Sequence, residues 1–159
     1  LTEAHKAIAR MGQLRDATTD PKFDFFKKHL DLQMLAASAW IAYGEGKKDE
    51  AAKWLRQAAD AEDLLGKHPA SPGALVPARE QLGNLLLEMD RPKDAQQEFA
   101  AALKIYPARF RSLYGAAKAA EQAGETESAR RRFAQLAKQT AKGDASRSEL
   151  ADIRSNRGE

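Results

Sequence analysis

The sequence predicts an all-α fold, and both its composition and the positions of its glycines and prolines point to this class. Alanine supplies 32 of the 159 residues, whereas valine, isoleucine and threonine together supply only ten. Helices favour alanine, leucine, glutamate and lysine, while strands favour β-branched residues. Glycine and proline then divide the chain into pieces of helical length. This combination argues against a sheet, and so against the dinucleotide-binding and hydrolase-type active sites that are built on one.

The first helix is expected at residues 2–17. Ile8, Met11 and Leu14 recur there at near-helical spacing. Pro21 follows shortly afterwards, and a helix does not readily continue through a proline. This segment therefore reads as one amphipathic helix that ends before Pro21.

Two more helices are expected at 22–45 and 49–65. A glycine-containing turn around Gly46 ends the first of them, and Gly66 ends the second. Residues 66–75 are expected to form a loop insertion, because two prolines and two glycines fall close together there.

Four further helices follow this loop, and short turns separate them. They are expected at 77–90, 92–105, 108–123 and 126–140. Turns of about three residues favour antiparallel helix pairs. A last short helix follows Gly143, where Ser146 and Glu149 match a capping box and Leu150 and Ile153 form the apolar side.

An internal repeat relates the helix pairs to one another. One unit, 76–109, carries a pattern of small and large apolar residues: Leu82, Gly83, Leu86, Ala95, Phe99, Ala102 and Pro107. Shifted by 34 residues, the pattern recurs in 110–143 as Ala116, Ala117, Ala120, Ala129, Phe133 and Leu136. Shifted back by 44 residues, it recurs more loosely in 32–65 as Ser38, Ala39, Ala42, Ala51, Leu55 and Ala58. The turn inside each pair recurs too, at Gly46, Asp90 and Gly124, so we expect three stacked units.

These residues resemble the tetratricopeptide repeat family. The resemblance is specific over 76–143, moderate over 32–65, and does not extend to the two ends of the chain. From Lys67 to Glu125 the sequence is also similar to the C-terminal part of bacterial tetratricopeptide proteins without an assigned function. One departure stands out, because Arg79 lies where the family prefers a large aromatic residue.

The resemblance implies a right-handed α-solenoid of antiparallel helix pairs with flanking capping helices. Residues 1–21 would form an N-terminal helix, either a cap or the remnant of a preceding unit. Residues 22–143 would hold the three helix pairs, and 144–159 a C-terminal capping helix and tail. A single pair cannot bury its apolar face alone, so stacking against neighbours is expected to stabilise the array.

The sequence carries no signal for catalysis or for a metal or cofactor. Its three histidines, His5, His29 and His68, are not spaced as metal ligands, and it contains no cysteine. The acidic residues within 60–63 are interpreted as surface charge. We therefore expect a non-enzymatic protein that needs no cofactor.

The charge balance argues against nucleic acid as a partner. The formal net charge is only +3, and the run Arg130–Arg132 spreads around a helix rather than forming a basic stripe. No apolar run approaches the roughly 20 residues that span a bilayer, so membrane insertion is not expected. The chain opens Leu-Thr-Glu without a methionine and is expected to be an excerpt or a processed product. The sequence assigns no compartment.

The resemblance implies binding by shape, because in this family the first helix of each pair lines a concave groove. Carried over to this chain, the groove-facing residues of the second and third units are Glu80, Asn84, Leu87, Glu88, Arg111, Tyr114, Lys118, Glu121 and Gln122. The partner-binding residues selected from this set are Glu80, Asn84, Arg111, Tyr114 and Lys118. The expected partner is a protein or an extended peptide with acidic residues, one of them near Arg111.

Other interpretations stay open. The groove face can be simply solvated, and in the first unit Trp40 and Tyr43 are interpreted as packing against the N-terminal helix. The chain can also be a structural segment that supports a larger protein whose N-terminal part is missing here. Self-association, with the chain acting as an oligomerisation unit, is the remaining alternative.

Overall fold

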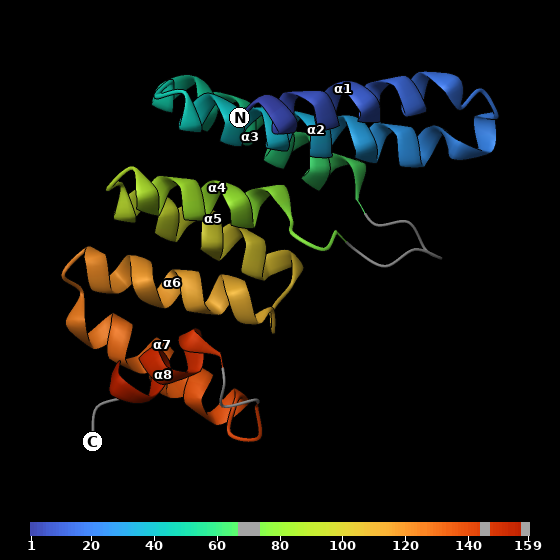
Figure 1. Cartoon of the computed structure of the whole chain (residues 1–159). Helices are drawn as coiled ribbons and strands as arrows, with labels where there is room; N and C mark the ends of the chain where they lie inside the picture. The colour runs from blue at the N-terminus through green and yellow to red at the C-terminus, as the bar shows by residue number, and fades with distance from the viewer. Residues whose placement is uncertain (67–73, 144–146, 157–159) are drawn as a thin grey trace. The chain divides into compact units, whose positions relative to one another are not determined.

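The computed structural model describes residues 1–66, 74–143 and 147–156, and the described part of the chain is built from helices without a strand (Figure 1). The elements are α1 (Thr2–Ala17), the 3-10 helix η1 (Pro21–Phe23), α2 (Asp24–Gly44), α3 (Lys48–Leu65), α4 (Ala78–Glu88), α5 (Pro92–Ile105), α6 (Phe110–Gln122), α7 (Thr126–Gln139) and α8 (Ser148–Asn156). The predicted all-α class is confirmed. Residues 67–73 of the expected loop and Ser146 of the expected capping box lie outside the described residues.

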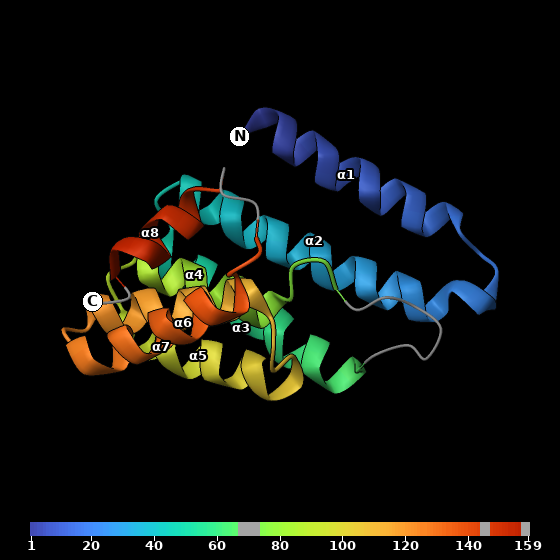
Figure 2. The same ribbon diagram turned by 90° about the horizontal axis from the view of Figure 1, so that it is seen from below.

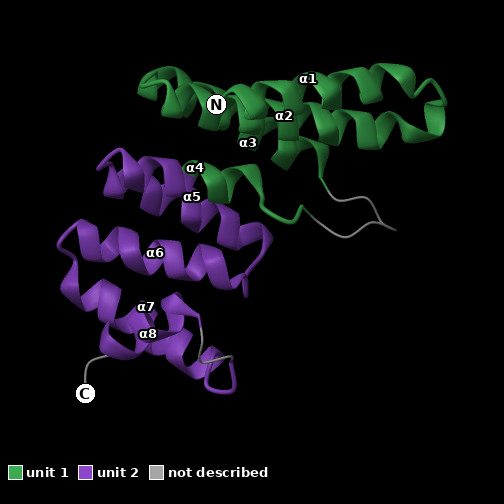
Figure 3. Cartoon of the chain, in the orientation of Figure 1, with its two compact units in different colours: residues 1–82 green, residues 83–159 purple. Residues whose placement is uncertain are grey.

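The chain forms two compact units, residues 1–82 and residues 83–159 (Figure 3). The division passes through α4, so the first residues of this helix belong to one unit and the last to the other. We describe each compact unit by itself and call them unit 1 (residues 1–82) and unit 2 (residues 83–159), which are not the repeat units expected from the sequence.

The turn inside each predicted helix pair has the same backbone structure. Its central residue adopts a positive φ in all three cases, with values of 83° at Gly46, 56° at Asp90 and 76° at Gly124. The amide of the following residue then donates to a carbonyl five residues earlier, and the three bonds are Lys47 to Ala42 (2.9 Å), Arg91 to Leu86 (2.8 Å) and Glu125 to Ala120 (2.9 Å). Glycine and aspartate tolerate this left-handed conformation, which is why these positions could be recognised as turns in the sequence.

In unit 1, α2 packs against both α1 and α3 (Figure 2). The α2–α3 contact is the better buried, because Ala39, Ala51, Leu55 and Ala58 are fully shielded from solvent. By contrast, none of the residues of α1 is buried. Helix α1 is therefore held through only part of its surface.

Side chains of α3 fix the start of α4. The carboxylate of Glu62 accepts a hydrogen bond from the Ala78 amide (2.6 Å), which satisfies one of the free donors at the helix N-terminus. The guanidinium of Arg79 bonds Asp60 through Nη2 and Asp63 through Nε, both at 2.6 Å. The acidic cluster that was interpreted as surface charge thus ties α3 to α4.

In unit 2, an aromatic ring fills the space that two glycines leave open. A methyl group on Gly83 of α4 would lie 2.8 Å from the ring of Phe99 in α5, and one on Gly115 of α6 would overlap the same ring. Phe99 itself is fully buried. Gly83 and Phe99, two members of the repeat pattern, are thus packed together, and Gly115, which is not part of that pattern, completes the space around the ring.

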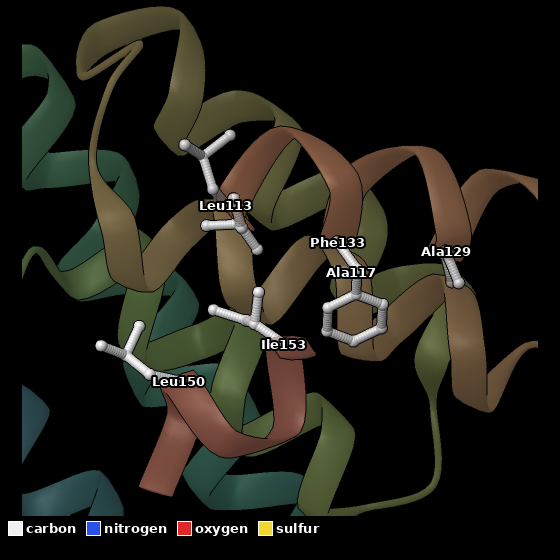
Figure 4. Close-up of a cluster of buried hydrophobic side chains, with 8 residues drawn as sticks. Leu113, Ala117, Ala129, Phe133, Leu150 and Ile153 are labelled. Atoms are coloured by element: carbon white, nitrogen blue, oxygen red, sulfur yellow. The ribbon is translucent and has the colours of Figure 1, made fainter. Parts of the chain in front are cut away.

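A second apolar cluster in unit 2 holds α8 against α6 and α7 (Figure 4). Leu150 and Ile153 of α8 are 4% and 1% exposed, and they pack with Leu113, Phe133 and Leu136. The predicted apolar side of the last helix is confirmed, and its burial places the neighbouring polar residues of α8 beside α6.

Candidate functional site

Four of the five predicted partner-binding residues belong to unit 2, and Glu80 belongs to unit 1. Arg111 is exposed, whereas Asn84, Tyr114 and Lys118 are half-buried. The Glu80 side chain is fully buried (0% exposed). This burial corrects the expectation that Glu80 faces a partner, because a side chain shielded from solvent offers no surface for one.

Tyr114 is positioned by two aromatic rings and by a hydrogen bond to α8. Its ring stacks on Phe110 (centroids 6.1 Å apart, planes at 13°) and meets the edge of Phe133 at 6.3 Å. Its hydroxyl donates a hydrogen bond to Oδ2 of Asp152 (2.6 Å). Burial and this bond to a carboxylate raise the pKa of Tyr114 well above its usual value, so the phenol stays protonated.

Lys118 lies one turn further along α6 and shares the same carboxylate. Its ammonium pairs with Glu121 on its own helix and lies 3.5 Å from Oδ2 of Asp152. Burial lowers the pKa of Lys118, but the two carboxylates outweigh it and the net pKa is raised. Lys118 is therefore a charged ammonium whose charge is already balanced within the chain.

The second carboxylate of α8, Glu149, lies within the electrostatic reach of Arg111. The backbone hydrogen bond at Glu149 lowers the pKa of its carboxyl group, and the positive charges of Arg147 and Arg111 lower it further. Glu149 and Asp152 stand three residues apart and so share one side of α8. The acidic groups that were expected from a partner are thus supplied, near Arg111 and Lys118, by the chain itself.

The sequence did not predict that α8 brings two carboxylates close to α6. Leu150 and Ile153 marked its apolar side, and the spacing of Glu149 and Asp152 was equally visible in the sequence. What the sequence did not show is which groups of α6 these carboxylates would meet.

Beside these contacts, unit 2 has an open cleft of ≈ 640 Å³ that we call the unit-2 cleft. It is lined by Leu87, Glu88, Asp90, Tyr114, Lys118, Glu121 and Gln122. All of these except Asp90 belong to the wider set that the family resemblance places in the groove. Asp90 enters from the turn after α4, where its carboxylate accepts a hydrogen bond from Nε2 of Gln122 (2.9 Å).

The lining of the unit-2 cleft is acidic. Glu88, Asp90 and Glu121 contribute three carboxylates, and Lys118 contributes the single cation among the seven lining residues. Because Lys118 is paired with Glu121 and Asp152, it adds little positive potential to the opening. Apolar surface is offered by Leu87 and by the ring of Tyr114.

In unit 1, Trp40 lies on the α1 side of α2. It lines a hollow together with Ala4, Ile8 and Met11 of α1, and its indole Nε1 donates to Oε1 of Gln81 (2.9 Å). Trp40 thus lines the hollow between α1 and α2, and its packing against the N-terminal helix stays a prediction.

The described residues show no arrangement suited to metal binding. No group of three or more histidine, cysteine, aspartate or glutamate side chains gathers among them in a way that could hold a metal ion. His29 packs against Phe25, with ring centroids 4.6 Å apart, and burial lowers the pKa of its imidazole. Within the same described part of the chain, the helices are too short or too polar to cross a membrane.

Two comparisons bear on this site. A family model described as tetratricopeptide repeat matches residues 86–153, a segment that runs from the second half of α4 into α8. No curated protein matches the chain in sequence. The matched segment contains all the residues that line the unit-2 cleft, together with Asp152 and Glu149 of α8.

Proposed function

Because residues 86–153 belong to the tetratricopeptide repeat family, we propose that the chain is a non-enzymatic interaction module that binds a segment of a partner protein in the unit-2 cleft. Repeats of this family generally mediate protein–protein interaction. The observation that supports this proposal is an open cleft within the matched segment, lined mostly by residues that the resemblance would place in a groove.

The lining of the cleft supports an extended segment rather than a small molecule. It combines a leucine and an aromatic ring with several charged and amide groups, a mixture that suits alternating side chains of a peptide. Tyrosine in such a setting supplies a large contact area at a low cost in conformational entropy. Since Tyr114 is fixed by Phe110 and Asp152, it is ordered before any partner arrives.

The charge of the cleft favours a basic partner segment over the acidic one that the sequence led us to expect. Acidic residues were expected in the partner, because Arg111 and Lys118 supply positive charge on this face. Asp152 and Glu149 of α8 lie beside these groups, while further carboxylates line the opening. We therefore propose a partner segment that carries lysine or arginine next to an apolar residue, which would meet the carboxylates and Leu87 together.

A binding experiment with matched peptides tests this proposal. Two labelled peptides of equal length and spacing are used, one built from glycine, leucine and lysine, the other with glutamate in place of lysine. Fluorescence anisotropy with the full chain should show tighter binding of the lysine peptide. The double variant Glu88→Gln/Glu121→Gln should weaken that binding about three- to tenfold, since each exposed charge pair is worth up to about 1 kcal/mol.

The matched control removes two carboxylates that lie outside the cleft. Glu50 and Glu127 are exposed residues in the first turns of α3 and α7, and the variant Glu50→Gln/Glu127→Gln should bind the lysine peptide as the wild type does. An equal loss in both double variants would mean that only the overall charge of the chain matters. Equal binding of the two peptides would contradict the proposed partner chemistry.

A further inference from the structure

Asp152 of α8 holds a fixed negative charge next to the unit-2 cleft. Its Oδ2 accepts the hydrogen bond from the Tyr114 hydroxyl (2.6 Å) and lies 3.5 Å from Nζ of Lys118, while its Oδ1 accepts one from Nδ2 of Asn156 (2.8 Å). The following residue, Ile153, is 1% exposed and anchors α8 in the apolar cluster of unit 2 (Figure 4). The carboxylate is therefore held in place, although Asp152 is not one of the seven residues that line the cleft.

Lys118 has two carboxylates for its one ammonium group. Glu121 pairs with it on the same helix, and Asp152 approaches it from α8. The side chains of Lys118 and Asp152 are 36% and 28% exposed, so that solvent screens their interaction only in part. The three charges together leave an excess of one negative charge at this side of the cleft.

The two carboxylates differ in what a partner can reach. Glu121 lines the cleft, whereas Asp152 does not. A cationic group of a partner that bonds Glu121 competes for it with Lys118. Without Asp152, that competition would leave the ammonium of Lys118 unpaired beside the incoming charge, and the two cations would repel each other. With Asp152 in place, Lys118 keeps a carboxylate when Glu121 turns to a partner.

We propose that Asp152 is a positioning residue that sets the charge preference of the unit-2 cleft: it retains Lys118 and so releases Glu121 for a lysine or arginine of the partner segment. This inference rests on the proposed function, because it concerns the same peptide in the same cleft. A helix that does not line the cleft thus determines which charge the cleft accepts. Without the Asp152 carboxylate, the cleft would present an ammonium group and accept a glutamate more readily.

A substitution that removes only the charge tests this inference. Asp152→Asn keeps a side-chain oxygen that can accept the Tyr114 hydroxyl. The dissociation constants of the lysine and glutamate peptides described above are measured by fluorescence anisotropy with the full chain. The preference for the lysine peptide should fall at least about threefold in Asp152→Asn, the size of effect expected from one partly exposed charge. The difference from the wild type should shrink at about 1 M salt, where charges are screened beyond roughly 3 Å.

Two outcomes of this measurement separate a role in charge preference from a merely structural one. A residue that only held Tyr114 and α8 in place would weaken both peptides by the same factor, and the preference would not change. That result overturns the inference. Asp152→Ser, a second neutral side chain that can accept the hydroxyl, should lower the preference as Asp152→Asn does. Far-ultraviolet circular dichroism should show unchanged helix content in both variants.

The variant Lys118→Gln tests whether Asp152 acts through the ammonium group. In the Lys118→Gln background, adding Asp152→Asn should change the preference clearly less than it does in the wild type, because no ammonium remains to be retained. An equal change in both backgrounds would show that Asp152 acts on the partner directly, and so would overturn the inference.

Asp24→Asn provides the matched control. Asp24 also pairs with a lysine, Lys27 at 2.9 Å, but it belongs to unit 1 and does not line the cleft. This variant should keep the preference of the wild type, and an equal fall in both variants would mean that only the overall charge matters. A wild-type preference that Asp152→Asn leaves intact overturns this inference alone. Equal binding of both peptides by the wild type overturns the proposed partner chemistry, and this inference with it.

Discussion

Arg79 shows how one residue can depart from the pattern of a family and still hold two helices together. It lies where tetratricopeptide repeats prefer a large aromatic residue, and its side chain is only 12% exposed. Asp60 and Asp63 of α3 each bond its guanidinium at 2.6 Å. Removing one partner of an ion pair that is shielded from solvent in this way is costly, because the charges that remain are left unpaired. The arginine and its two carboxylates therefore replace the packing of an aromatic ring.

We predict that Arg79→Ala lowers the free energy of unfolding by about 1–3 kcal/mol, the range for losing shielded hydrogen bonds to charged groups. Arg130→Ala is the matched control, since Arg130 pairs with Glu127 on one helix and both side chains are more than half exposed. That variant should cost less than about 0.5 kcal/mol. Urea denaturation of the three chains measures the difference, and equal losses would show that the bonds to α3 contribute nothing of their own.

At the scale of the elements, the packing of α4, α5 and α6 in unit 2 depends on the absence of two side chains. Gly83 and Gly115 leave room for Phe99, which stands between α4 and α6. Glycine inside a helix costs roughly 1 kcal/mol relative to alanine. The contact with a fully buried ring must therefore offset an intrinsic weakness in both helices.

The variant Gly115→Ala should lower the free energy of unfolding by about 1–3 kcal/mol, because a methyl group there overlaps Phe99 and forces the helices apart. Gly12→Ala should instead raise it by up to about 1 kcal/mol. Gly12 is also inside a helix, but its added methyl group would meet nothing closer than Cε of Met34 at 3.4 Å. Thermal or urea unfolding compares the two, and a stabilising Gly115→Ala would show that the ring can move aside.

At the scale of the whole molecule, the sequence predicted the helices and turns better than it predicted the contacts between helices. Each expected helix between 2 and 140 is present with its ends within two residues of the prediction. Gly46, Asp90 and Gly124 marked turns that share a positive φ, because a backbone conformation of this kind restricts the residue at its own position. The register of the repeat then led to most of the residues that line the unit-2 cleft.

What the sequence did not predict depends on contacts between elements. Glu80 was expected to face a partner, but its side chain is fully buried in the folded chain. Asp152 was visible as an acidic residue, yet only the packing of Leu150 and Ile153 brings it to Tyr114. The interactions of Asp152 with Lys118 and of Glu149 with Arg111 were not visible in the sequence, and they are one reason why we propose a cationic rather than an acidic partner segment.

The central claim is that the unit-2 cleft receives a cationic segment of a partner protein. Nuclear magnetic resonance of the isotopically labelled full chain, titrated with the lysine peptide described above, tests this claim most directly. The largest amide shift changes should fall on residues 87–90 and 114–122, which contain the lining of the cleft. The glutamate peptide should leave those amides unchanged. Shift changes centred on α1 and α2, or equal changes with both peptides, would contradict the claim.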